Sequence, residues 1–361
     1  MLTAVAAASD IRADDFASVV LDYQPAPGQF INDPQFNDPA RALGAPVGGG
    51  LTDPDNSKLV SLGAFGGSLT LAFSGPVLDD PNNPLGLDAI VFGNAHFIAG
   101  NPNRRWAEAA HIEISRDANG NGLADDAWYL IPGSHLLDPA SQWWEQWWDD
   151  DAGTATPPED LSWYPDPATY PWIGPLYRTS GYALDHGLFG PLIVENPNGL
   201  DASDEGYFGY ADCTPTLALP DGVAAEVFYT VPDDPLVVGV SAGSGGGDAF
   251  DIAWAIDPVT LQPANLDGFD FIRLSTAVAY DPDPTFGEKS AEIGGVADVR
   301  SAGVPGDVNG DGVVDQSDLG LLLAAYDSGP GDPQWNEAAD LDGDGWVGQP
   351  DLGILLANYD G

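Results

Sequence analysis

Two acidic loops near the C-terminus carry the clearest chemical pattern in the sequence. They read DVNGDGVVDQSD (307–318) and DLDGDGWVGQPD (340–351), with Asp or Asn at positions 1, 3 and 5, Gly at 6 and Asp at 12. Oxygen ligands at these positions, with a backbone carbonyl at position 7, wrap a Ca²⁺ ion, and the Gly allows the sharp turn. Because both loops match at every one of these positions, the sequence predicts two calcium sites rather than two solvated acidic turns.

The predicted ligands follow directly from the positions in each loop. Those of the first loop are Asp307, Asn309, Asp311, the Val313 carbonyl, Asp315 and Asp318. Those of the second loop are Asp340, Asp342, Asp344, the Trp346 carbonyl and Asp351. In the second loop Gly348 leaves the ninth position to water. Both loops end in Asp, whereas the usual EF-hand loop ends in Glu.

Each loop leads into a short helical pattern with apolar residues at i, i+3, i+4 and i+7. These residues are Leu319, Leu322, Leu323 and Tyr326, and then Leu352, Leu355, Leu356 and Tyr359. Helices of this length do not fold alone in water, so the two are expected to pack on each other. A bound cation neutralises the loop carboxylates, which predicts that calcium binding and folding of this segment are coupled.

Residues 306–361 resemble the dockerin type I family, the duplicated calcium-loop–helix module that docks enzymes and surface proteins onto cohesin domains. The resemblance implies calcium binding by the ligands named above. In that family, loop positions 10 and 11 and the following helix carry the partner contacts, typically hydroxyl pairs and Lys or Arg. Here those positions hold Gln316-Ser317 and Gln349-Pro350, and neither helix contains a basic residue. The expected partner is therefore a cohesin-like or cell-surface protein, and the departure argues against a standard cohesin.

A third loop with the 1-3-5 spacing lies in the middle of the chain, in RDANGNGLADDAWYL (116–130). Its twelfth position is Trp128 instead of an acid. The two Asn-Gly pairs are also ordinary hairpin-turn chemistry, which is the alternative interpretation. The Asp pair is not needed for a turn and favours one calcium ion in the body. Its candidate ligands are Asp117, Asn119, Asn121, the Leu123 carbonyl, Asp125 and Asp126.

A Trp-rich stretch, with Pro and Asp interleaved, spans about residues 132–180 and holds six of the 11 Trp residues. Exposed aromatic faces stack on sugar rings, so this stretch is a candidate glycan-binding platform. The alternative is a small core that caps one edge of the fold, since Trp is mostly buried. The residues proposed to bind a glycan are Trp143, Trp144, Trp147 and Trp148.

No catalytic residue is predicted. Residues 239–243 (GVSAG) fit G-x-S-x-G, but a Gly-rich loop follows instead of a helix, and all four His precede the Ser, which excludes the nucleophile elbow. A carboxylate pair for glycoside hydrolysis has no specificity among 56 acidic residues. No zinc-type spacing of His or Cys is present. If the protein were an enzyme, a glycoside hydrolase-type activity would be the expected class.

The composition limits the kinds of partner. The 361 residues carry a formal charge of −46, which repels phosphate backbones and anionic membranes and therefore excludes nucleic acid. Adaptation to a saline habitat is an alternative source of this acidity. A hydrophobic content of 43% argues for a folded chain, and no stretch is long enough to span a membrane. The start, MLTAVAAASD, resembles the end of a secretory signal without its basic region, so the signal is truncated or the likeness is accidental. A secreted or cell-surface location is expected.

The remaining sequence predicts a mainly β body. Short apolar runs bounded by turn residues favour a jelly-roll-like β-sandwich over residues 16–300, with the Trp-rich insertion inside it. The expected strands are 68–73, 89–95, 111–115, 225–231, 250–256 and 271–278. Residues 1–15 are expected to be a signal-peptide remnant or disordered, 301–305 a linker, and 306–361 the small α dockerin-like module.

The body also resembles uncharacterised bacterial, planctomycete-like cell-surface proteins. The likeness rests on VFGNA (91–95), DANGNGLADDAWYL (117–130), FGYAD (208–212) and FDIAWAID (250–257), and it implies no activity. The sequence therefore predicts a secreted, calcium-binding, non-catalytic surface or assembly protein docked through its tail. The alternative is a carbohydrate-binding or polysaccharide-degrading component of an extracellular complex.

Overall fold

The computed structural model describes most of the body and of the tail. The described residues are 15–26, 30–63, 67–102, 104–133, 143–146, 182–185, 193–195, 208–237, 239–276, 290–299, 306–309, 314–342 and 345–359. The chain forms two compact units, one made of Met1–Asp79 with Leu87–Val299 and the other of Asp80–Gly86 with Arg300–Gly361. The expected linker 301–305, and all but the last residue of the N-terminal segment 1–15, lie outside the described residues.

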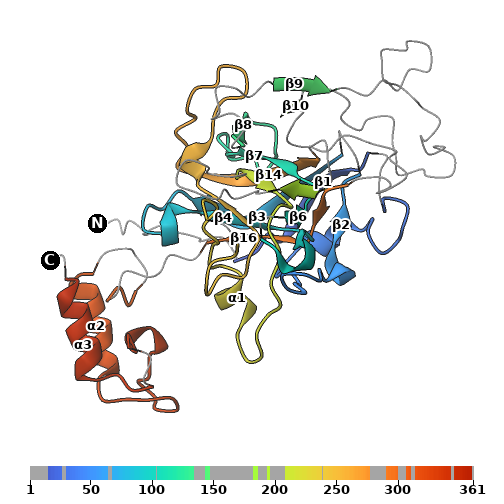
Figure 1. Cartoon of the computed structure of the whole chain (residues 1–361). Coiled ribbons are helices and arrows are strands. Elements are labelled where there is room, and N and C mark those ends of the chain that lie inside the picture. The colour runs from blue at the N-terminus through green and yellow to red at the C-terminus, as the bar shows by residue number, and fades with distance from the viewer. Residues whose placement is uncertain are drawn as a thin grey trace, which may run out of the picture. The chain divides into compact units, whose positions relative to one another are not determined.

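The body is built on one large antiparallel sheet (Figure 1). Its strands run in the order β1–β3–β14–β7, and β8 and β12 both pair with β7. Their bounds are β1 Val19–Gln24, β3 Ser68–Leu78, β14 Gly268–Thr276, β7 Ala110–Ser115, β8 Trp128–Ile131 and β12 Tyr210–Ala211. Strand β14 comes late in the chain yet lies between β3 and β7, so this sheet joins distant parts of the sequence.

Shorter strands form smaller antiparallel sheets around it. One has the order β13–β4–β16, a second pairs β15 with β2, a third has the order β11–β6–β5, and β9 pairs with β10. Their bounds are β13 Asp248–Phe250, β4 Ala89–Phe92, β16 Gly295–Asp298, β15 Glu292–Ile293, β2 Val60–Ser61, β11 Ile193–Glu195, β6 Arg104–Trp106, β5 His96–Phe97, β9 Trp143–Gln146 and β10 Tyr182–Asp185. Short 3₁₀ turns connect these elements: η1 Pro39–Ala42, η2 Asn56–Lys58, η3 Pro84–Gly86, η4 Ile98–Gly100 and η7 Ile252–Trp254.

Alternation along the strands places one face of the large sheet in the main core. Leu69 and Leu71 of β3 and Ile272 and Leu274 of β14 are fully buried there. They pack in one cluster with residues of the smaller sheets, such as Val91 in β4. The expected mainly β body is thereby confirmed.

Two of the expected strands are wrong. Residues 225–228 form the single-turn helix α1 (Ala225–Phe228), which is followed by Tyr229, whose ring packs edge-on against Phe92 with centroids 5.4 Å apart. In the run 250–256 the strand ends at Phe250, because the Asp251 side chain accepts a hydrogen bond from the Ala253 N–H at 2.7 Å and starts η7. Short apolar runs fit either structure, and local hydrogen bonding decided both cases.

The C-terminal unit contains helices α2 (Gln316–Ala325) and α3 (Gln349–Ala357) and the 3₁₀ turn η8 (Glu337–Ala339). Its core is shared between the helices and the loops before them: Val308, Val314, Leu322, Ala325, Ala339, Val347 and Leu355. Of the expected apolar stripe, Leu322 and Leu355 are fully buried, whereas Leu323, Leu356 and Tyr326 are 53%, 55% and 38% exposed. The stripe prediction is wrong at these three positions, because valines from the loops complete the core of the module. Among the described residues, no helix has the length and apolar character needed to cross a membrane.

Candidate calcium centres

The first loop is organised around the carboxylate of Asp318, in the first turn of α2. Asp318 is fully buried, and its Oδ1 accepts hydrogen bonds from the N–H groups of Val308 (2.8 Å) and Asn309 (2.9 Å). Its Oδ2 accepts a third hydrogen bond, at 2.9 Å, from the N–H of Asp315, which is the N-cap residue of α2. Desolvation raises the pKa of Asp318, but these N–H donors outweigh it and lower the pKa below its ordinary value. The carboxylate at position 12 is thus held in its charged form against the start of the loop.

The second loop repeats this arrangement around Asp351. Its Oδ1 accepts from the N–H groups of Leu341 (2.7 Å) and Asp342 (3.2 Å), and its Oδ2 accepts from the Gly348 N–H at 2.6 Å. Asp351 is also fully buried in the first turn of its helix. Each donor in one loop therefore has its counterpart at the equivalent position of the other.

The acids of the second loop converge on one point. Asp340, Asp342 and Asp351 each place a carboxylate oxygen within 4.8 Å of the other two. The Oδ2 of Asp340 accepts from the Gly345 N–H at 2.9 Å, while its Oδ1 is buried and has no hydrogen-bond partner in the described part of the chain. Three clustered carboxylates with an unsatisfied buried oxygen fit a hard divalent cation, which prefers oxygen ligands and offsets their repulsion.

The structure describes only part of the predicted ligand sets. Asp311, Val313 and Asp344 lie outside the described residues. Asp307, Asn309, Asp315 and Trp346 are described and occupy the expected loop segments before and beside the helices.

The comparison with known families identifies this unit. Residues 305–358 match the family model of the dockerin type I domain. Residues 305–358 form a dockerin type I module. This match confirms the resemblance inferred from the two loops. Modules of this family bind calcium and cohesins. The match covers the C-terminal module and leaves the body unassigned. Among curated proteins, no match to the chain was found.

In the body, the loop between β7 and β8 gathers the side chains expected to bind calcium. The Oδ1 of Asp117 accepts from the Asn121 N–H at 3.0 Å, and its Oδ2 accepts from the Gly122 N–H at 2.7 Å. The side-chain amide of Asn119 donates to Asp125 at 3.2 Å and to Asp126 at 3.1 Å. The loop thus closes on itself through five side chains, the fifth being Asn121, whose amide donates to Asp125. These bonds agree with both a turn and a calcium loop, so this site remains a proposal.

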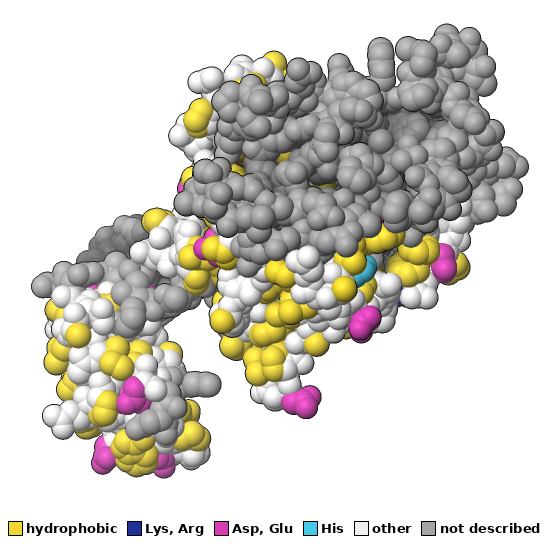
Figure 2. All heavy atoms as spheres, viewed as in Figure 1, with side chains coloured by type: hydrophobic (Ala, Val, Ile, Leu, Met, Phe, Trp, Pro, Cys, Tyr) yellow, Lys and Arg dark blue, Asp and Glu magenta, His cyan; other side chains and the backbone are white. Residues whose placement is uncertain are grey.

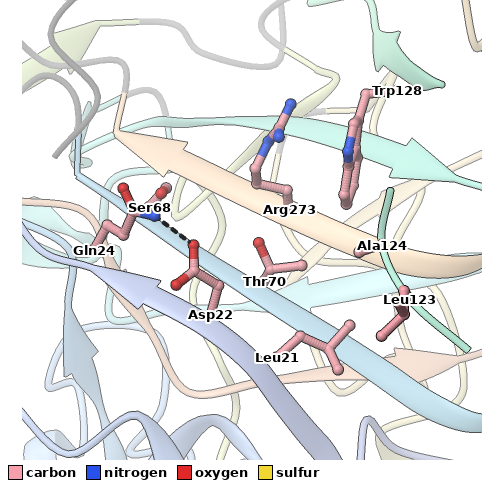
Figure 3. A pocket seen from close by; sticks show the side chains of 9 residues that line it. All are labelled: Leu21, Asp22, Gln24, Ser68, Thr70, Leu123, Ala124, Trp128 and Arg273. Carbon is pink, nitrogen blue, oxygen red and sulfur yellow. Dashed lines mark hydrogen bonds between the residues drawn. The ribbon is translucent and has the colours of Figure 1, made fainter. Parts of the chain in front are cut away.

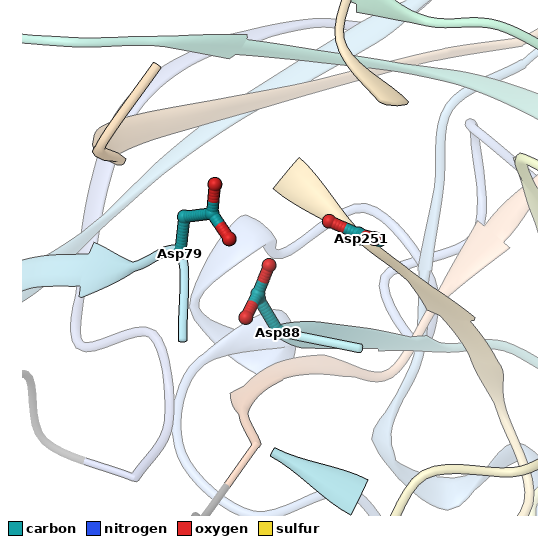
Figure 4. A group of neighbouring side chains, drawn as sticks. All are labelled: Asp79, Asp88 and Asp251. Carbon is teal, nitrogen blue, oxygen red and sulfur yellow. The ribbon is translucent and has the colours of Figure 1, made fainter. Parts of the chain in front are cut away.

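A further acidic cluster in the body was missed by sequence reasoning (Figure 4). Asp79, Asp88 and Asp251 each place a carboxylate oxygen within 4.8 Å of the other two. Asp88 is fully buried, and its Oδ2 accepts from the Ile252 N–H at 2.9 Å. Burial raises the pKa of Asp251, the bond from Ala253 opposes this rise, and the charge of Asp79 adds to it. Either a proton or a cation can relieve the repulsion. No local signal in the sequence links these distant residues.

A second missed group is a set of three buried acids in the body. Glu108, Asp212 and Glu292 are all buried, and desolvation raises the pKa of Glu108 to about 8 and that of Asp212 to about 7. Desolvation and the charges of the other two raise the pKa of Glu292 well above its ordinary value. Its Oε1 accepts from the Ser61 hydroxyl at 2.7 Å. Backbone N–H groups donate to Asp212 and Glu108, and the Ser61 hydroxyl donates to Glu292, which indicates a structural role for the three acids.

The remaining candidates from the sequence are the serine of the G-x-S-x-G run and the four Trp residues proposed to bind a glycan. Ser241 lies in a loop, where its hydroxyl accepts from the Asp234 N–H at 3.1 Å, as expected for a residue that is no nucleophile elbow. Trp143 and Trp144 lie in β9, opposite Asp185 and Leu184 of β10, and only their backbone is described. Trp147 and Trp148 lie outside the described residues.

Proposed function

We propose that this protein is a secreted, calcium-binding, non-catalytic component of an extracellular assembly, attached to its partner by the dockerin module. The observation that carries the proposal is the repeated cradle of three backbone N–H groups around Asp318 and around Asp351. It holds the closing carboxylate of each loop ready for a cation, as calcium-dependent docking requires. The family match to residues 305–358 supports the same function.

The docking face is expected to be neutral and apolar. Loop positions 10 and 11, Gln316-Ser317 and Gln349-Pro350, are exposed at the start of the two helices. Seven residues after each Gln, and thus on the same helix face, stand the exposed leucines Leu323 and Leu356. Hydrophobic side chains reach the surface of this unit in Figure 2. A partner with an apolar contact surface fits this face better than an acidic one, so we expect a cohesin-like protein that differs from standard cohesins.

For the body, we propose one calcium ion in the loop 117–126 and no catalysis. A carbohydrate-binding or polysaccharide-degrading role is the second candidate, through the Trp-rich stretch that contains Trp143, Trp144, Trp147 and Trp148. An extracellular location would supply the calcium that all three loops need.

Counting the bound ions by native mass spectrometry tests the calcium proposal. We expect two ions in the tail and one in the body. The double variant Asp318→Ala with Asp351→Ala should lose the two tail ions, whereas Asp117→Ala with Asp126→Ala should lose the body ion. Unchanged stoichiometry in either double variant would contradict the corresponding assignment. Reducing-sugar release from polysaccharides by the full chain would contradict the non-catalytic role.

A further inference from the structure

A cavity of about 520 Å³ opens on the face of the large sheet that points away from the main core. Its volume lies in the range of small-molecule sites, roughly 300–1,000 Å³. Figure 3 shows the side chains that line it, which come from β1, β3, β14, β8 and the loop before β8. The lining residues are Leu21, Asp22, Gln24, Ser68, Thr70, Leu123, Ala124, Trp128 and Arg273.

The strand register explains why this face is polar. Asp22 is paired with Thr70, Thr70 with Arg273, and Arg273 with Glu113, so these side chains form one row across four strands. The neighbouring row contains Ser68 paired with Ser275. A sheet face covered with hydroxyl, carboxylate and guanidinium groups is unsuited to packing against a second apolar layer, but it presents many hydrogen-bond partners.

Two buried hydroxyl groups on this face have no hydrogen-bond partner among the residues that the structure describes. Ser275 lies two residues after Arg273 on β14, and Ser115 is paired with Trp128. Both side chains are fully buried, and within the described part of the chain neither hydroxyl has a partner. Unsatisfied buried hydroxyls are costly, which marks this face as polar beneath the cavity, although neither serine is among the residues that line it.

An aromatic platform stands at one end of the cavity. The Arg273 guanidinium lies 4.2 Å from the centre of the Trp128 ring, and it donates to Glu113 twice, from Nε at 2.9 Å and from Nη2 at 2.8 Å. This bidentate hydrogen bond to Glu113 fixes the guanidinium, which in turn supports the Trp128 indole. A rigid aromatic ring beside hydroxyl and amide groups is the combination that stacks on a sugar ring and bonds its hydroxyls.

The charge balance of the cavity selects against anionic ligands. Glu113 neutralises Arg273, and Asp22, which accepts from the Gln24 amide at 2.6 Å, leaves the cavity with a net negative charge. An anionic ligand would be repelled here and by the charge of −46 on the whole chain.

We infer that this cavity binds a neutral saccharide, with Trp128 as the stacking platform and Asp22 and Thr70 as hydrogen-bond partners. The inference goes beyond the docking function, which does not require it, and it places glycan binding outside the Trp-rich stretch. Leu123 and Ala124 form one wall of the cavity and belong to the loop 117–126. Calcium bound to that loop therefore strengthens saccharide binding; this second part rests on the calcium site proposed for the body.

The test uses the full chain in excess calcium. An array of neutral cello-, xylo- and manno-oligosaccharides, with oligogalacturonate as the anionic comparison, identifies a probe for calorimetry. We expect retention of at least one neutral probe, with affinity reduced about tenfold or more in Trp128→Ala and in Thr70→Val. Phe30→Ala removes an exposed aromatic ring elsewhere in the body and should leave the affinity unchanged. Circular dichroism establishes that each variant is folded, and Asp22→Asn provides a third, mild change of the cavity.

Three results would overturn the inference. They are binding of none of the neutral probes, preference for oligogalacturonate, and unchanged affinity in both folded Thr70→Val and Trp128→Ala proteins. For the calcium coupling, we expect EDTA or Asp126→Asn to weaken saccharide binding by about fivefold or more, and Asp318→Ala with Asp351→Ala to leave it unaltered. Equal affinity with and without calcium would overturn the coupling, whereas ion counting tests the calcium sites independently.

Discussion

The Oδ1 atom of Asp212 accepts hydrogen bonds from the backbone N–H of Asn94 at 2.8 Å, joining two segments that are far apart in the sequence. The same oxygen accepts from the Ala95 N–H at 3.0 Å, and Oδ2 accepts from the Glu292 N–H at 3.0 Å. Asp212 adopts a left-handed backbone conformation with φ of 58°, which costs free energy in any residue but Gly. The three bonds hold it there, and they give VFGNA (91–95) and FGYAD (208–212) a shared structural role.

Removing the Asp212 carboxylate should destabilise the body. Asp212→Ala leaves three N–H groups without their acceptor, and we expect a loss of about 2–4 kcal/mol in the free energy of unfolding. Urea unfolding of the full chain, followed through the body transition, measures it. The matched control is Asp221→Ala, an exposed site expected to change stability by less than about 0.5 kcal/mol. Equal stability of the two variants would show that the bonds to Asp212 do not hold the motifs together.

The buried acids predict how stability depends on pH. The pKa of Glu108 is raised to about 8, so between its ordinary value near 4.5 and pH 8 the folded state binds more protons than the unfolded state. Stability of the body should therefore fall as pH rises through this window and level off above it. The raised pKa values of Asp212 and Glu292 act in the same direction. Calorimetry between pH 5 and 9, in excess calcium, measures the body transition.

The variant Glu108→Gln should flatten this pH profile, because it removes one of the groups that titrates. At pH 8 we expect it to be more stable than the wild type by on the order of 1 kcal/mol. The exposed site Glu226→Gln is the control and should keep the wild-type slope. A Glu108→Gln profile as steep as that of the wild type would exclude this carboxyl as a source.

Chelation should unfold the dockerin module selectively. Without the cation, the carboxylates within each loop repel one another. The small core of the module cannot offset the free energy of this repulsion. We expect hydrogen exchange in EDTA to abolish protection of 319–326 and 352–359 while protection in β14 persists. The double variant Asp318→Ala with Asp351→Ala should show the same loss in calcium. Protection of the two helices that survives EDTA would contradict the coupling of binding and folding.

The exposed leucines of the module should carry partner binding. Leu323→Asp with Leu356→Asp places charge on the expected docking face and should weaken binding to a cohesin-like partner by about tenfold or more. The control Leu321→Asp changes an exposed leucine that points in a different direction on α2. Calorimetry against the partner in calcium compares the variants. If Leu321→Asp were the more harmful change, the docking face would lie elsewhere on the helix.

The two acidic loops could be recognised from sequence because their pattern lies within twelve consecutive residues. Position in such a loop predicts which side chain faces a cation, so Asp318 and Asp351 could be proposed as ligands before any fold was known. The runs 68–73 and 271–278 could be predicted as strands for the same local reason, and they fall on β3 (Ser68–Leu78) and β14 (Gly268–Thr276), whose full bounds only the structure gave. The runs 225–231 and 250–256 could not, because a few apolar residues fit several structures and nearby hydrogen bonds decided between them.

Only the tertiary structure decided what distant residues do together. Asp79, Asp88 and Asp251 meet because β3, β4 and β13 bring their ends together, and Asp212 reaches Asn94 by the same kind of long-range contact. The cavity beside Trp128 depends on the register of β1, β3 and β14, in which a shift of one residue would turn Asp22, Thr70 and Arg273 to the opposite face. Register and strand order arise from packing of the whole chain, so they cannot be predicted from sequence spacing alone.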